Sequence, residues 1–213
     1  MTTLILIRHG ESEANRNNVF AGHINPDLQN KGLKQAERTA KYITENYKVD
    51  KIYSSDIQRA FKTAKALGEL LNLEVITEES LREIYAGEWE NMKFDDLPVL
   101  FPAEFEAWTT NIGYAICPNG ESVKQLGERV MSALTKIAEE NNGKTIVIAT
   151  HATPIRVAQS IVQTGGLDEM KNIPWVSNAS VTVFEYENKS FKAMKISEDA
   201  HLSELRTALP DNV

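Results

Sequence analysis

The sequence predicts an α/β fold with three layers, α/β/α, in which helices cover both faces of a mostly parallel central sheet. Short apolar runs typical of strands alternate with longer segments whose apolar residues recur every three or four positions. The runs at 3–7 and 145–150 are mostly apolar, as strands buried on both faces are. Strand–helix alternation of this kind favours parallel pairing through right-handed crossovers.

The first part of the chain provides three of the expected strands and two of the expected helices. We expect strands at 3–7, 49–53 and 73–77. Apolar residues at helical spacing predict helices over 33–47 and 57–71. Ser55 and Gln58 have the form of a capping box before the second of these helices.

Residues 84–120 interrupt the alternation. They contain many of the aromatic side chains and three prolines, and no run typical of a strand. We therefore expect one domain over 1–213, with a helical or loop lid inserted at 84–120.

The pattern then resumes in the last part of the chain. A helix over 123–137 is expected, with Ser122 and Gln125 as its capping box. After the strand at 145–150, Thr153 as a cap and Pro154 at the first helical position predict the start of the next helix. The β-rich runs 180–186 and 191–196 predict a hairpin, followed by a polar helix or tail.

Composition excludes several classes of protein. A chain of 213 residues with 42% apolar and 25% charged residues is ordinary for a globular domain, and no apolar run reaches the roughly 20 residues of a membrane helix. The net charge of −7 disfavours nucleic acid or an anionic membrane as partner. A single cysteine, Cys117, and an N-terminus without secretory signal features favour a cytoplasmic location.

Polar residues follow the expected strands at the edge where α/β sheets bind ligands. His9 and His151 come directly after the strands at 3–7 and 145–150. The same edge is expected to carry three further side chains, those of Arg8, Arg59 and Glu83.

This combination of side chains suits phosphoryl transfer. Guanidinium groups and helix N-termini bind phosphate, and a neutral imidazole can attack phosphorus. A carboxylic acid can protonate the departing alcohol. Taken singly, each residue has an ordinary structural role open to it: a hydrogen-bonded strand-end histidine, a solvated arginine or a surface glutamate. Residue types and spacing alone therefore predict a phosphate-binding α/β protein and nothing more specific.

Local sequence blocks narrow this prediction. Five of them occur in the same order as in a known family: 6–12 (Leu-Ile-Arg-His-Gly-Glu-Ser), 54–60 (Ser-Ser-Asp-Ile-Gln-Arg-Ala), 81–83 (Leu-Arg-Glu), 119–122 (Asn-Gly-Glu-Ser) and 150–156 (Thr-His-Ala-Thr-Pro-Ile-Arg). Together they resemble the histidine phosphatase superfamily, in its phosphoglycerate mutase-like branch, through most of the chain.

The resemblance implies a role for each matching residue. His9 would be the phosphate acceptor and Glu83 the proton donor. The remaining residues would bind the phosphate or border the substrate mouth: Arg8, Asn15, Gly22, Arg59, His151 and Ala152. No metal or other cofactor is implied.

The charge of the expected lid favours a phosphatase over a mutase. Between residues 84 and 117 one basic residue, Lys93, stands against six acidic residues, which gives a local charge of −5. Such a negatively charged segment would repel a carboxylated, doubly phosphorylated metabolite and so would bind it poorly. We therefore expect a phosphomonoesterase of small phosphorylated metabolites, with a phosphoglycerate mutase-type phosphotransferase or a non-catalytic phospholigand-binding protein as alternatives. The natural substrate and the oligomeric state are left open.

Overall fold

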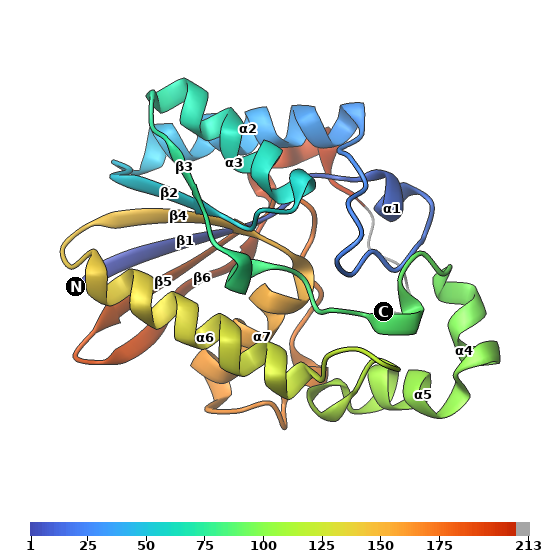
Figure 1. Cartoon of the computed structure of the whole chain (residues 1–213). Coiled ribbons are helices and arrows are strands. Elements are labelled where there is room, and N and C mark those ends of the chain that lie inside the picture. The colour runs from blue at the N-terminus through green and yellow to red at the C-terminus, as the bar shows by residue number, and fades with distance from the viewer. Residues whose placement is uncertain (208–213) are drawn as a thin grey trace.

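A mixed β-sheet forms the centre of the computed structural model, which describes residues 1–207 (Figure 1). Within these residues the strands are β1 (Thr2–Arg8), β2 (Lys51–Ser54), β3 (Val75–Thr77), β4 (Thr145–Thr150), β5 (Val181–Glu187) and β6 (Ser190–Glu198). Their order across the sheet is β3-β2-β4-β1-β5-β6. The first four are mutually parallel, whereas β5 pairs antiparallel with both β1 and β6.

Helices cover both faces of this sheet, so the predicted three layers are confirmed. On one face lie α2 (Asn30–Asn46) and α3 (Gln58–Leu71); on the other lie α6 (Val123–Glu140) and α7 (Ala152–Thr164) (Figure 1). Within residues 1–207, no helix combines the length and apolar character required to cross a membrane.

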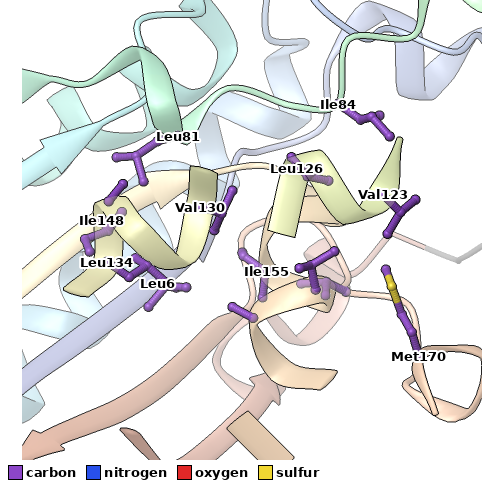
Figure 2. Packing of buried hydrophobic residues seen from close by; sticks show 14 of the residues in the cluster. Leu6, Leu81, Ile84, Val123, Leu126, Val130, Leu134, Ile148, Ile155 and Met170 are labelled. Atoms are coloured by element: carbon purple, nitrogen blue, oxygen red, sulfur yellow. The ribbon is translucent and has the colours of Figure 1, made fainter. Parts of the chain in front are cut away.

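Alternating side chains of β1 divide the core between the two layers. Leu4 and Leu6 belong to the cluster under α6 and α7, whereas Ile5 and Ile7 belong to the cluster under α2 and α3. Figure 2 shows the first cluster, where Leu6 lies among Val130 and other side chains of α6. A strand that is apolar on both faces is thus buried on both faces, as the run at 3–7 predicts.

Residues 84–120 lie beyond the end of the sheet and contain no strand. They form α4 (Leu97–Leu100), α5 (Pro102–Thr110) and short 3₁₀ turns, in the position seen at the right of Figure 1. Trp89 and Trp108 pack edge-on at 5.6 Å between ring centroids, and both contact Phe20, just after the short helix α1 (Glu13–Arg16). Most of the aromatic side chains here therefore build the local core.

Two of the predicted helix starts are wrong and one is confirmed. Ser122 and Gln125 form the predicted capping box of α6. The predicted box of Ser55 and Gln58 does not exist. The main-chain N–H of Ser55 still donates to Ala149 O in β4, at 2.9 Å, and α3 begins only at Gln58, with Ile57 at the cap position.

Helix α7 also starts earlier than predicted. It begins at Ala152, so Thr153 and Pro154 lie inside its first turn, and the extended residue His151 occupies the cap position without a side-chain cap bond. Both differences arise at strand ends, where the sheet and the site decide how the chain leaves the strand.

The predicted hairpin is confirmed. Asn188 and Lys189 connect β5 and β6, and both have positive φ (50° and 63°), as the tight turn of a two-residue hairpin requires. A 3₁₀ segment at Ala200–Leu205 follows; the rest of the expected polar tail, 208–213, lies outside the described residues.

Candidate active site

Strand register brings the two predicted histidines together. β1 pairs in parallel with β4, with Arg8 opposite Thr150, so the residues that follow both strands emerge side by side. The rings of His9 and His151 meet edge-on with centroids 5.2 Å apart. The site therefore forms at the carboxyl ends of adjacent parallel strands, as the sequence predicts.

The tautomer of His9 follows from its hydrogen bond. Nδ1 lies 2.8 Å from the carbonyl oxygen of Gly10, and because a carbonyl can only accept, Nδ1 carries the proton. Nε2 is therefore an unprotonated nitrogen, and the Nε–H of Arg59 donates to it at 3.3 Å. Burial and the positive charges of Arg59 and Arg8 hold the pKa of His9 well below its usual value. The imidazole is neutral, and its unprotonated Nε2 accepts the hydrogen bond from Arg59.

Two buried arginines provide the positive charge of the site. Arg59 donates from Nη1 to Ile24 O and from Nη2 to Gly22 O, both at 2.9 Å, which fixes its guanidinium beside His9. Arg8 donates from Nη1 to Val176 O. Burial lowers the pKa of each arginine to about 10, so both remain cationic at neutral pH.

Glu83 is buried beside the first turn of α7. Its Oε1 accepts from the main-chain N–H of Ile84 at 2.8 Å, and Oε2 accepts from that of Thr153 at 3.4 Å. A carboxyl in this place can exchange protons with a group bound in front of His9.

His151 packs against the ring of His9. It is fully buried and does not line the cavity described below. Nε2 lies 2.9 Å from the hydroxyl of Ser55, and Nδ1 has no hydrogen-bond partner within residues 1–207. Burial, followed by the positive charge of Arg59, holds the pKa of His151 well below its usual value.

A cavity of about 130 Å³ connects the predicted residues. Those that line it are Arg8, His9, Asn15, Gly22, Arg59, Glu83 and Ala152. Its apolar wall carries four aromatic side chains: Phe20, Phe94, Trp108 and Trp175. Two guanidinium groups, an unprotonated imidazole nitrogen and a carboxyl group thus surround a space for a small anion with an apolar group attached.

Comparison with known proteins decides the family. The model of the histidine phosphatase superfamily (branch 1) matches residues 4–199. The chain belongs to the histidine phosphatase superfamily. Phosphoserine phosphatase 1 of Hydrogenobacter thermophilus is 32% identical over 205 residues, which cover 96% of each chain. The family and its relatives place the chain among the phosphoric monoester hydrolases.

Solved structures of other members share the fold. Bacillus stearothermophilus YhfR superimposes with a TM-score of 0.90 at 27% identity and covers 95% of this chain and 100% of its own. A phosphoserine phosphatase variant of Entamoeba histolytica in complex with phosphoserine superimposes with a TM-score of 0.83 at 27% identity, over 95% of this chain and 100% of its own.

Sequence reasoning missed several residues of this histidine phosphatase site. Asn178 donates from Nδ2 to His9 O at 3.0 Å and to Asn15 Oδ1 at 3.2 Å, and so links the two. Ser55 contacts His151, and Trp175 lines the cavity. Ser55 lies in the 54–60 block, but the block does not predict its contact with His151, and Trp175 and Asn178 lie outside the five blocks. Only the fold brings these three residues to the site.

Proposed function

We propose that this chain hydrolyses small phosphate monoesters through a phosphohistidine on His9, with Glu83 as proton donor. The observation that carries the proposal is the hydrogen bond from His9 Nδ1 to Gly10 O, which leaves Nε2 unprotonated beside the Arg59 guanidinium. A nucleophile needs this lone pair, and the phosphate needs this positive charge.

The reaction takes two displacements. When the phosphate binds, the Nε–H of Arg59 turns from His9 Nε2 to a phosphoryl oxygen. The Nε2 lone pair then attacks phosphorus, the bond between phosphorus and the ester oxygen breaks, and the leaving oxygen takes the proton of the Glu83 carboxyl. The Glu83 carboxylate then takes a proton from water while the water oxygen attacks phosphorus. The P–N bond breaks, its electron pair returns to Nε2, and inorganic phosphate leaves. Arg8 and Arg59 bind the phosphoryl oxygens throughout.

Water is the proposed acceptor rather than a second phosphorylated metabolite. Among the described residues that line the cavity, Arg8 and Arg59 are the cationic side chains, and both belong to the phosphate site. The segment 84–117 adds a charge of −5. A mutase would need further positive charge for the second acidic group of its substrate. Phosphoserine, the substrate named for several relatives, is the first metabolite to test.

Trapping of the phosphoenzyme tests the proposal. The protein is mixed with a ³²P-labelled monoester, quenched in alkali and examined for acid-labile, alkali-stable label. We expect label on the wild type and on His201→Gln, a histidine variant outside the site, and no label on His9→Ala. Label retained by His9→Ala contradicts the assignment. Transfer to phosphoglycerate that outpaces phosphate release supports the mutase alternative.

A further inference from the structure

The backbone that carries Glu83 has no regular structure of its own. It lies between the 3₁₀ turns at Glu79–Leu81 and Gly87–Trp89. A general acid must keep its carboxyl within hydrogen-bond reach of the leaving oxygen, and a misplacement of about 1 Å can cost roughly 10²-fold in rate. The position of Glu83 therefore has to be fixed by contacts from elsewhere in the fold.

Arg129 on α6 supplies these contacts. Its Nη1 donates to the carbonyl oxygens of Ser80 and Arg82, both at 2.9 Å, and its Nη2 donates to Glu83 O at 2.7 Å. Three main-chain carbonyls before and at the proton donor thus converge on a single guanidinium. Because the guanidinium is planar and rigid, it fixes their relative positions.

Glu121 completes the contact and holds the following residue. Its Oε1 accepts from Arg129 Nε at 2.7 Å and its Oε2 from Arg129 Nη2 at 2.9 Å. These bonds, with those to the carbonyls, employ all five N–H groups of the guanidinium. Glu121 Oε2 also accepts from Tyr85 N at 3.2 Å, and Glu121 N donates to Tyr85 O at 2.8 Å. The backbone is therefore held on both sides of Glu83.

A second bond ties the same carbonyl to the phosphate site. His23 Nε2 lies 2.8 Å from Glu83 O, and the neighbours of His23 in the chain, Gly22 and Ile24, accept from the Arg59 guanidinium. This turn therefore links the backbone of Glu83 to the guanidinium of Arg59, beside His9.

We infer that Arg129 and Glu121 are positioning residues for the proton donor, an inference that rests on the proposed function. Neither side chain lines the cavity, and with its five N–H groups occupied Arg129 has no donor left for a substrate. The pair acts through the backbone of Glu83. It governs the step that needs a proton on the leaving oxygen, whereas Arg8 and Arg59 govern phosphate binding.

Two esters of nearly the same shape separate these steps. The 4-nitrophenolate of 4-nitrophenyl phosphate leaves without a proton, whereas the alkoxide of 4-nitrobenzyl phosphate needs one. We expect Arg129→Met to lower kcat/KM, which reports the transfer of the phosphoryl group to His9, by about 30- to 100-fold for the benzyl ester and by less than about 3-fold for the phenyl ester. Hydrolysis of the phosphohistidine also uses Glu83 but is common to both esters, so it does not enter this comparison. Arg129→Lys keeps the charge but has at most three donors, and should restore only part of the loss.

The double variant Glu83→Gln/Arg129→Met is the control for a general structural effect. Without the proton donor, loss of Arg129 has no further selective consequence, so the ratio of the kcat/KM values for the two esters should equal that of Glu83→Gln alone. If Arg129→Met fails to fold, Glu121→Gln should show the same selectivity at about 5- to 10-fold.

Three results would overturn the inference. They are an equal loss of kcat/KM on both esters, full recovery in Arg129→Lys, and an additional selective loss in the double variant. Failure of the wild-type protein to release phosphate from either ester contradicts the proposed function itself, and the inference with it. Hydrolysis of both esters with parallel losses in the variants contradicts the positioning role alone.

Discussion

The buried histidines should make the stability of this protein depend on pH in a range where carboxylates contribute little. His9 is 4% exposed and His151 is fully buried, and burial together with the charge of Arg59 holds the pKa of each well below 6.5. In the unfolded chain both should titrate near 6.5. As the pH falls below this value the unfolded state binds protons that the folded state does not, so the free energy of unfolding falls.

The size of the effect follows from linkage. A histidine that stays neutral in the folded state and titrates near 6.5 in the unfolded state costs about 1.4 kcal/mol between pH 7.5 and pH 5.5. The two together cost about 2.7 kcal/mol. Asp27 and Asp56 have pKa values lowered by Lys62 and Arg82, and their contribution is lost at more acidic pH, below this range.

Urea unfolding of the wild type and of His151→Gln at pH 7.5 and pH 5.5 measures the effect. The variant should lose about 1.4 kcal/mol less than the wild type on acidification. His201, whose pKa is also lowered by burial, is present in both proteins and cancels in the comparison. Inorganic phosphate should reduce the dependence, because a bound dianion favours the charged imidazole. Equal pH dependence in the two proteins refutes the reasoning.

Three further predictions concern packing and the chemistry of the site. Gly10→Ala would place a Cβ 2.3 Å from the main-chain oxygen of Gly32, so we expect the free energy of unfolding in urea to fall by about 3 kcal/mol. The matched control is Gly166→Ala, whose Cβ meets nothing within 4 Å and which should change the free energy of unfolding little. Burial raises the pKa of Cys117 to about 12, so iodoacetamide should label it only at the rate of unfolding, and fast labelling of native protein contradicts this. EDTA should leave phosphate release unchanged, because Arg8 and Arg59 supply the positive charge; restoration of a lost activity by added metal would show otherwise.

Much of the fold was predictable because its signals are local. The apolar runs at 3–7 and 145–150 became β1 and β4, and the hairpin followed from two β-rich runs around Asn188 and Lys189. The helix starts at Ser55 and Thr153 were mispredicted for one physical reason. At strand ends, groups near the expected cap hydrogen-bond to the sheet or to the site instead: Ser55 N donates to Ala149 O, and Thr153 N donates to Glu83 Oε2. A local sequence pattern does not contain these long-range bonds.

The sequence by itself determined which residue types stand at the carboxyl ends of the strands and in which order the motifs occur. These features identify the family and predict which side chains form the site: His9, Arg8, Arg59 and Glu83. Only the tertiary structure decided the rest: which nitrogen of His9 is unprotonated, that His151 does not line the cavity, and that Arg129 holds the backbone of Glu83. The bond of His9 reaches only the next residue, but Gly10 is itself held by a bond from its N–H to Thr63 Oγ1, 53 positions away, and Arg129 lies 46 positions from Glu83. Bonds over such distances depend on strand register and helix packing, which the chain specifies only as a whole.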